Sequence, residues 1–330
     1  MDRFLLPMAL ALLASTSSSA QQPAAGATSR AASVPFEAGT PLGIAVEGRR
    51  TPMSANVKVY GAVVSAESCS YDALRDLIMV VNRGAPQTDV ANDAFVSLLN
   101  HDGSVHTARW IGVNRNGLVL NEPYGSDVLS GKLYLADSDG GGPNGAPRTS
   151  VIRIFDVATG APSGEIKVPE SPWFNDIALA ADGTIYATQT GSADGQVPMR
   201  VYKITPAGAA SVLIEGAPLN LPNGIALDQD GNVVVINIGS TAVFTYSPAG
   251  KLLKTEQAAQ SGNDGLVIMP DGTKYISSVR LGGVQRIRNG KAAELVAAGI
   301  PSAASMCLDK GAKQLVIPLN PNNAVAIVKL

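Results

Sequence analysis

One short pattern recurs along this chain of 330 residues and limits the folds that it can adopt. In each copy, a run of alternating apolar residues is followed by an Asp-Gly pair and then by a second β-rich run. Alternation of period two on both sides of such a pair is typical of a β-hairpin. The three clearest copies span 177–186, 225–234 and 266–275. The sequence therefore predicts a series of hairpins of the same kind.

Each hairpin continues into two further strand-like runs, so that the repeated unit is predicted to hold four strands. After the first hairpin these runs are 200–205 and 211–214. Looser copies of the unit lie at 67–81, 124–135 and 304–316. Six copies between residues 57 and 330 give about 46 residues per copy, a spacing typical of the blades of a β-propeller.

We therefore predict an all-β fold, a six-bladed β-propeller with four antiparallel strands in each blade. The last copy ends after three strands, at Leu330. An N-terminal strand within Val57–Val64 would supply the fourth and close the ring, which removes exposed sheet edges. A pair of β-sandwiches is the alternative, and the even spacing favours the propeller.

The N-terminal residues differ from the rest of the chain. Arg3 is followed by an apolar run to Ala14 and by small residues to Ala20, a pattern typical of a secretory signal peptide over 1–20. The run is too short to span a bilayer core of about 30 Å, although Asp2 keeps an uncleaved anchor as the alternative. Residues 21–56 are predicted to be a linker or N-terminal extension, and 57–330 the propeller. We expect a periplasmic or secreted protein with no membrane partner after signal cleavage.

Composition narrows the partners of the protein. The chain has 25 Lys and Arg against 27 Asp and Glu, so it has no basic excess to attract nucleic acid. We expect a small-molecule substrate, and the oligomeric state stays open. The two cysteines, Cys69 and Cys307, lack the spacing of zinc ligands. Two free buried thiols are the preferred interpretation; a disulfide is the alternative, because the first and sixth blades would be neighbours.

Residues directly before the first strand of each copy should meet at one end of the central channel, because those strands line it. Four of the six equivalent positions carry a carboxylate or amide oxygen: Glu67, Asn175, Asn223 and Asp264. Their total charge of −2 balances one divalent cation. Oxygen ligands suit Ca²⁺ best, with Mg²⁺ or Zn²⁺ as alternatives. Any one of these residues alone could instead belong to a turn, since Asn-Gly and Asp-Gly are common turn dipeptides.

The same segments resemble the blade signatures of the senescence-marker-protein/gluconolactonase/luciferin-regenerating-enzyme-like family. The resemblance rests on 174–176, 222–231 and 263–265 and, in degenerate form, on 67–72. It implies a six-bladed propeller with one divalent metal, usually calcium, at the channel mouth. It also implies lactone hydrolysis or, in some branches, phosphotriester hydrolysis. The implied ligands are Glu67, Asn223 and Asp264, with Asn175 bound directly or through water.

The sequence departs from this family at Trp173. Sugar-lactonase members commonly have a substrate-binding arginine two residues before the third-blade Asn, which is Asn175 in this sequence. An indole offers a flat apolar face and one hydrogen-bond donor in place of a charged fork. We therefore expect Trp173 to bind a substrate that is less polar or less anionic than a sugar-acid lactone.

A cation at this place would polarise a lactone carbonyl and stabilise the oxyanion formed on attack. Asp264 is the candidate general base or nucleophile. Asp176 is a candidate to bind substrate, or only caps a turn. His101 and His106 fall in the late strands of the first copy, which argues against a paraoxonase-type histidine dyad, and the absence of Gly-x-Ser-x-Gly argues against a serine esterase.

The predicted function is a metal-dependent hydrolase of a lactone or related ester. The alternative is a non-catalytic ligand-binding or interaction propeller, suggested by Trp173 and by Ser68, which replaces the glycine that follows the first-blade Glu in the family. A strictosidine-synthase-like propeller, which needs no metal, is a third candidate. The four oxygen-bearing residues argue against it.

Overall fold

The computed structural model describes residues 43–47, 49–60, 63–86, 89–112, 118–142 and 145–330. All described residues belong to one compact unit, 39–330. The predicted signal peptide (1–20) and most of the predicted linker (21–56) lie outside the described residues. Within the described ranges, no helix has the length and hydrophobicity that a membrane span requires.

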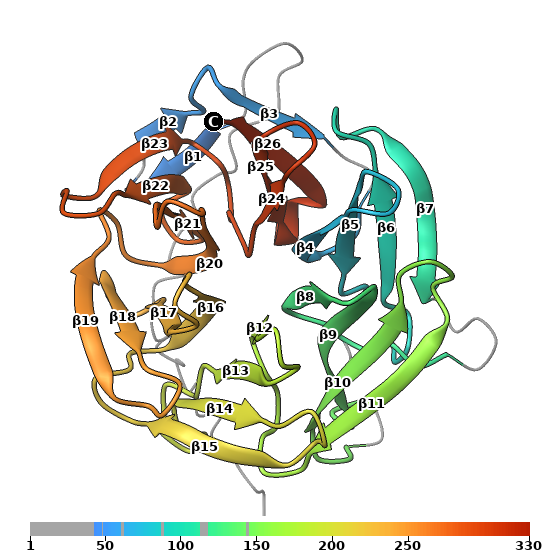
Figure 1. The fold of residues 1–330 in the computed structure, drawn as a ribbon. Helices are drawn as coiled ribbons and strands as arrows, with labels where there is room; N and C mark the ends of the chain where they lie inside the picture. Colours follow the sequence, from blue (N-terminus) through green and yellow to red (C-terminus); the bar gives the residue numbers. More distant parts are fainter. Residues whose placement is uncertain (1–42, 48, 61–62, 87–88, 113–117, 143–144) are drawn as a thin grey trace, which may run out of the picture. The chain divides into compact units, whose positions relative to one another are not determined.

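Twenty-four of the 26 described strands form six four-stranded antiparallel sheets arranged around a central channel (Figure 1). This confirms the predicted all-β, six-bladed propeller. The first blade consists of β4 (Ala66–Asp72), β5 (Leu77–Asn82), β6 (Phe95–Leu99) and β7 (Val105–Gly112). The second consists of β8 (Ser126–Leu129), β9 (Lys132–Asp139), β10 (Thr149–Asp156) and β11 (Pro162–Val168). The third consists of β12 (Ile177–Leu179), β13 (Ile185–Gln189), β14 (Arg200–Ile204) and β15 (Ala210–Glu215).

The remaining blades follow the same order, from the channel outward. The fourth consists of β16 (Pro222–Leu227), β17 (Val233–Asn237), β18 (Ala242–Tyr246) and β19 (Leu252–Gln257). The fifth consists of β20 (Asn263–Ile268), β21 (Lys274–Ser278), β22 (Gly283–Ile287) and β23 (Glu294–Ala298). The innermost strands of the first five blades, β4, β8, β12, β16 and β20, are also the first in sequence.

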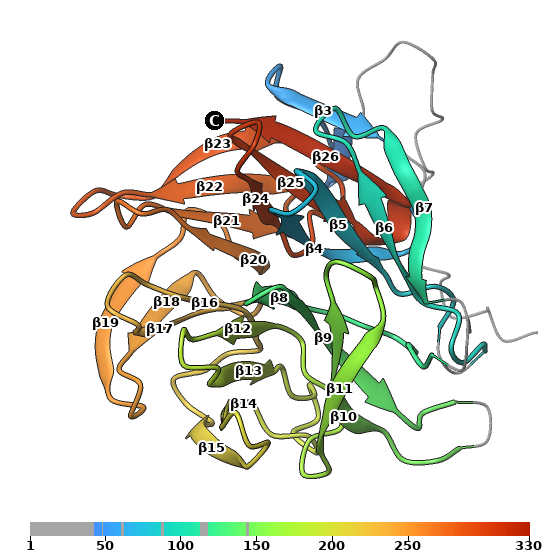
Figure 2. The same ribbon diagram turned by 45° about the vertical axis from the view of Figure 1, so that its right-hand side comes forward.

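The sixth blade combines the two ends of the propeller sequence. It consists of β24 (Cys307–Asp309), β25 (Gln314–Leu319), β26 (Ala324–Lys329) and β3 (Val57–Tyr60), and the 3-10 helix η2 (Asn320–Asn322) joins β25 to β26. β3 pairs antiparallel with β26, with Val57 opposite Val328 (Figure 1 and Figure 2). An N-terminal strand therefore forms the outer edge of the last blade.

Part of the segment predicted as a linker has regular structure. β1 (Gly43–Val46) and β2 (Arg49–Pro52) form a two-stranded hairpin. Directly after it, Ser54 contacts the fifth blade, because its backbone N–H donates to the Ala298 carbonyl at 2.9 Å. The Ala298 N–H in turn donates to the Ser54 hydroxyl at 2.8 Å.

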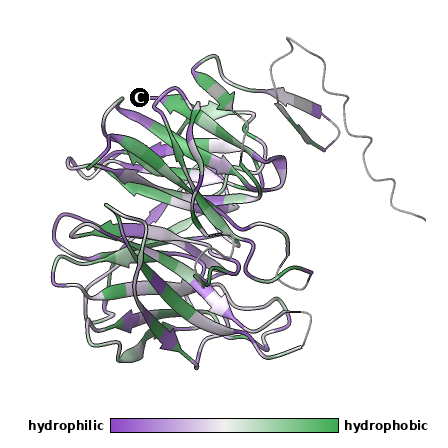
Figure 3. Cartoon of the chain, turned by 90° about the vertical axis from the view of Figure 1, so that its right-hand side faces the viewer, coloured by the Kyte–Doolittle hydropathy of each residue, from purple (hydrophilic) through white to green (hydrophobic). Residues whose placement is uncertain are grey.

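The core lies between adjacent blades. Middle strands are covered on both faces by neighbouring sheets, so a strand such as β17 reads as a continuous buried run, Val-Val-Val-Ile-Asn. Outer strands such as β19 are mostly exposed and carry charged residues. Figure 3 shows the apolar residues concentrated in the strands. Each sheet thus buries its apolar side chains against the next one around the ring.

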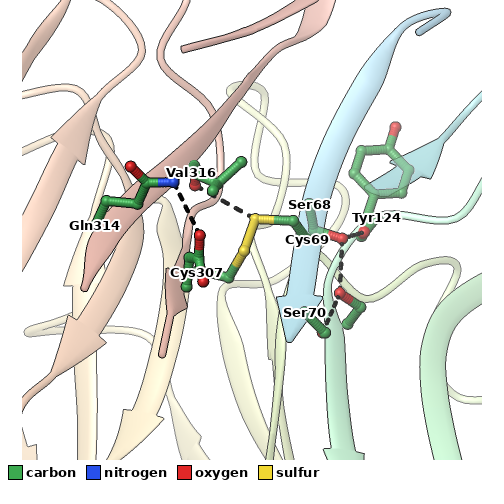
Figure 4. The surroundings of a disulfide bond; sticks show 9 residues. Ser68, Cys69, Ser70, Tyr124, Cys307, Gln314 and Val316 are labelled. Atoms are coloured by element: carbon green, nitrogen blue, oxygen red, sulfur yellow. Dashed lines mark hydrogen bonds between the residues drawn. A yellow bond between two sulfur atoms is a disulfide. The ribbon is translucent and has the colours of Figure 1, made fainter. Parts of the chain in front are cut away.

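Cys69 in β4 and Cys307 in β24 form a disulfide between the first and sixth blades (Figure 4). The preferred expectation of two free thiols is therefore wrong. Closing the ring brings the innermost strands of these two blades together, and the Cα atoms lie 5.4 Å apart, within the normal range for a disulfide. The bond joins residues 238 positions apart in sequence and links the two ends of the ring covalently.

His101 lies at the same seam, in the turn between β6 and β7. Its Nδ1 is 2.9 Å from both carboxylate oxygens of Asp309 in the sixth blade. Its Nε2 is 3.2 Å from Asp76, which also accepts a hydrogen bond from Tyr71. The hydrogen bond to Asp309 raises the pKa of His101, and Asp76 adds to this effect, whereas the partial burial of the ring opposes it. The protonated imidazolium therefore connects the first and sixth blades.

Removing the disulfide should destabilise the ring. A Cys69→Ser/Cys307→Ser double variant should lose about 2–5 kcal/mol of unfolding free energy, because the unfolded chain regains the freedom that the long loop denied it. Urea unfolding under non-reducing conditions measures this. Adding a reductant should lower the midpoint of the natural sequence and leave that of the double variant unchanged. Equal midpoints for both proteins without reductant would contradict the prediction.

Stability should also fall as pH rises through the pKa of His101. The pKa of His101 is higher in the folded state than in the unfolded state. The stabilisation by the protonated ring is therefore complete below the unfolded value of about 6.5 and is lost as pH rises through the folded-state pKa. His101→Gln should flatten the decrease in melting temperature between neutral and mildly alkaline pH. His106→Gln is the matched control, since His106 is exposed and bonds only to Thr107 within the described chain. An unchanged profile in His101→Gln is the opposing result.

Candidate functional site

Three of the four predicted oxygen residues occupy the same place in their blades. Glu67, Asn223 and Asp264 are each the second residue of an innermost strand, in β4, β16 and β20 respectively. Asn175 lies two residues before β12. The first three side chains are buried, and Asn175 is half-buried. We call the end of the channel at which these strands begin the channel mouth.

The structure brings Glu67, Asn223 and Asp264 together at the channel mouth. Burial raises the pKa of Asp264 well above its ordinary value, and the charges of Glu67 and Asp176 raise it further. A hydrogen bond from Asn223 acts in the opposite direction on the same pKa. Asn175 is fixed separately, because its amide donates to the Thr190 hydroxyl at 3.0 Å.

Two oxygens in this group have no partner in the described part of the chain. They are Asn223 Oδ1 and Asp264 Oδ1, and both are buried. A buried oxygen without a hydrogen bond costs about 1–3 kcal/mol, so such atoms are rare in native proteins. A cation bound at the mouth would give both oxygens a partner and would offset the charge of Asp264. The donor set therefore fits a divalent metal that prefers oxygen.

Glu67 is also bonded to residues of the protein itself. Its Oε2 accepts a hydrogen bond from the Asn320 amide and lies 3.5 Å from Arg83 Nη1. Burial raises the pKa of Glu67, and the charge of Arg83 opposes this. The described residues contain no group of three or more His, Cys, Asp or Glu side chains that could hold a metal. A metal site here therefore depends on the amides of Asn223 and Asn175 as well as on the carboxylates.

Asp176 joins two blades. Its Oδ1 accepts from its neighbour Ile177 N–H at 2.9 Å, and its Oδ2 accepts from Ile225 N–H of the fourth blade at 3.1 Å. Burial raises the pKa of Asp176 to about 8. The residue also lines a cavity of about 420 Å³ that follows the innermost strands as far as Lys310. Asp176 thus faces the channel while holding β12 beside β16.

The glycines that follow the mouth residues allow the blades to approach closely. A Cβ on Gly224 would lie 2.4 Å from the Asp264 carbonyl oxygen, and one on Gly265 would lie 2.5 Å from the Met306 nitrogen. Neither glycine is in a turn, since both lie in innermost strands. The Asn-Gly and Asp-Gly pairs at the mouth are therefore strand starts that need glycine for close packing.

Two charged residues at the mouth, Arg83 and Arg148, were missed by the sequence analysis. Arg83 hydrogen bonds to Glu122, whose other oxygen accepts from Arg148 Nη2 at 3.1 Å. The Arg148 guanidinium lies 5.9 Å from the centre of the half-buried Trp173 ring. Arg83 follows a second strand and Arg148 precedes a third strand. The end of a second strand and the start of a third strand reach the channel mouth together with the starts of the innermost strands. Only knowledge of this arrangement would have identified Arg83 and Arg148 from the sequence.

Comparisons with known proteins agree with this architecture. A sequence profile described as the SMP-30/gluconolactonase/LRE-like region matches residues 67–318. A search of curated proteins found no match. Among solved structures, virginiamycin B lyase from Staphylococcus aureus has a TM-score of 0.58 at 12% identity, covering 84% of this chain and 99% of its own.

A gluconolactonase from Xanthomonas campestris gives the same TM-score of 0.58 at 17% identity, over 84% of this chain and 90% of its own. A streptogramin B lyase has a TM-score of 0.51 at 15% identity, over 84% and 87%. At these identities the structural likeness shows the fold alone. The sequence profile covers most of the propeller, from the start of β4 to β25, and by this match the chain belongs to the SMP-30/gluconolactonase/LRE-like family.

Proposed function

We propose that this protein is a metal-dependent hydrolase that acts on a lactone or a related ester. The observation that carries the proposal is the pair of buried, unpartnered oxygens on Asn223 and Asp264, beside Glu67 at the channel mouth. Membership of a family that includes gluconolactonases supports it.

One divalent cation would be held by Asp264, Asn223 and Glu67, with Asn175 bound directly or through water. Ca²⁺ suits these oxygens best, and Mg²⁺ and Zn²⁺ are the alternatives. When bound, the cation supplies Lewis-acid polarisation of the ester carbonyl. The Asn320 and Arg83 contacts of Glu67 would orient its carboxylate within the set.

The remaining steps belong to side chains of the protein. Asp264 would act as general base or nucleophile, for which its buried position at the channel mouth is suited. Trp173 would give the substrate a flat apolar surface. Asp176 would meet a substrate group that enters the channel, and it also keeps β12 and β16 in register with the mouth.

We also propose that the protein acts on its small-molecule substrate after export, in the periplasm or outside the cell. The signal-like pattern over residues 1–20 supports this. The Cys69–Cys307 disulfide adds support, because such bonds persist in oxidising compartments.

Hydrolysis of a lactone panel should require metal and Asp264. A chelator should abolish turnover and added Ca²⁺ should restore it. Asp264→Asn should lower kcat by about 10²–10⁴-fold, since the variant loses the base. The matched control is Asp271→Asn, because Asp271 precedes a glycine in the same blade but is exposed, and within the described chain its carboxylate accepts from Thr273. Undiminished turnover in metal-free protein would exclude the mechanism.

A non-catalytic ligand-binding propeller is the second candidate, and one observation favours it. Arg83 places a positive charge beside Glu67, which reduces the need of that carboxylate for a metal. Tight binding of lactones or phosphotriesters without turnover would support this candidate. Metal-dependent hydrolysis of any member of the panel would exclude it.

A further inference from the structure

A chain of alternating charges crosses the channel mouth from the first blade to the second. Glu67 lies 3.5 Å from Arg83, Arg83 hydrogen bonds to Glu122, and Glu122 accepts from Arg148 at 3.1 Å. The two carboxylates are buried, with 8% of each side chain exposed. Arg148 is the outer member of the chain, with 26% of its side chain exposed.

The packing around Arg148 fixes its side chain. Its Nε and Nη2 donate to the Ser138 hydroxyl at 3.2 and 3.0 Å, in addition to the bond to Glu122. Its aliphatic stem packs against Gly141, where a Cβ would lie 2.4 Å from Arg148 Cγ. A guanidinium that is already oriented loses little conformational entropy when it binds a ligand.

Arg148 also keeps hydrogen-bond donors available. A guanidinium has five N–H groups, and in the described part of the chain no acceptor is bonded to Arg148 Nη1. Arg83 is different: both of its terminal nitrogens face carboxylates, and its guanidinium lies 4.3 Å from the Tyr124 ring centre. Arg83 is therefore used within the protein, whereas Arg148 can bind a further group.

We infer that Arg148 is a specificity-determining residue that binds a carboxylate on the substrate, while Trp173 contacts the adjoining apolar part. For the reaction, this inference rests on the proposed function. It makes the preferred substrate a carboxylate-bearing lactone or ester, because the N–H groups of Nη1 and the positive charge of the guanidinium favour an anionic oxygen acceptor. Glu122 is the positioning residue that holds Arg148 in place. The expectation from Trp173 alone, a less anionic substrate, is replaced by this one.

Two lactones that differ in one group test the inference. In 5-oxotetrahydrofuran-2-carboxylate a carboxylate replaces the methyl group of γ-valerolactone. Arg148→Met should raise KM for the acid by about 10–100-fold. It should leave kcat for the acid, and both kcat and KM for γ-valerolactone, nearly unchanged. Arg148→Lys should retain part of the preference for the acid over γ-valerolactone. Arg286→Met is the matched control, since Arg286 pairs with Glu294 at 2.8 Å on the fifth blade.

An equal loss on both lactones, or no loss on the acid, would overturn the inference. Glu122→Gln should raise KM for the acid more than KM for γ-valerolactone, a split that a merely structural defect would not produce.

A binding experiment separates this inference from the proposed hydrolysis. In Trp110→Phe protein the remaining tryptophan is Trp173, so its fluorescence reports on ligands near Arg148. Cyclopentanecarboxylate should change this emission, whereas neutral cyclopentanecarboxamide should not, and Arg148→Met should abolish the change. This result would support the carboxylate site even in a protein that hydrolyses no lactone. No response to the carboxylate would contradict it.

Discussion

The close approach of innermost strands around the channel is the constraint on which the rest of this structure depends. In the described residues the innermost strands of adjacent blades belong to separate sheets, and side-chain hydrogen bonds join them in addition to the backbone bond from Gly125 N–H to the Asn175 carbonyl. The Thr188 hydroxyl of the third blade hydrogen bonds to the carbonyl of Asn223 in the fourth, and Ser277 of the fifth bonds to the carbonyl of Ala304 beside the sixth. Ser68 of the first blade bonds to the Tyr124 carbonyl before the second (Figure 4).

These connections also explain why polar groups are buried at the mouth. Glycine after Asn223 and after Asp264 lets one backbone lie against the next, which draws their side chains into a small space with Glu67. Bringing carboxylates together away from water is unfavourable unless a positive charge or hydrogen bonds compensate. Arg83 and Asn320 provide this for Glu67. The charge of Arg83 also acts on Asp264, but Asp264 Oδ1 has no hydrogen-bond partner in the described chain. The buried polar cluster at the mouth is therefore a consequence of how tightly the ring closes.

The sequence predicted the features that repeat, namely the blades and the residues at equivalent positions in them. It did not predict contacts between residues that lie at different positions of the repeat. The period of the hairpins sufficed for the six blades, and the repeat phase sufficed to select Glu67, Asn223 and Asp264. The disulfide was judged wrongly because two isolated cysteines carry no pattern, although their strands are neighbours once the ring closes. Arg83 and Arg148 were missed because they follow and precede other strands, so no phase relates them to the mouth residues.

Stabilising contacts and candidate reactive groups are largely separate along the channel. The His101–Asp309 contact lies where innermost strand β24 ends, whereas Asp264 lies where β20 begins. Asp127 repeats the role of Asp176 one blade earlier, accepting the Leu179 N–H at 2.8 Å, and burial raises its pKa to about 6. Because these contacts join blades without involving Arg148 or Trp173, the side chains that would select a substrate can change without loosening the ring. A propeller of this kind can therefore keep the buried oxygen groups at its mouth while the residues at the positions of Arg148 and Trp173 change.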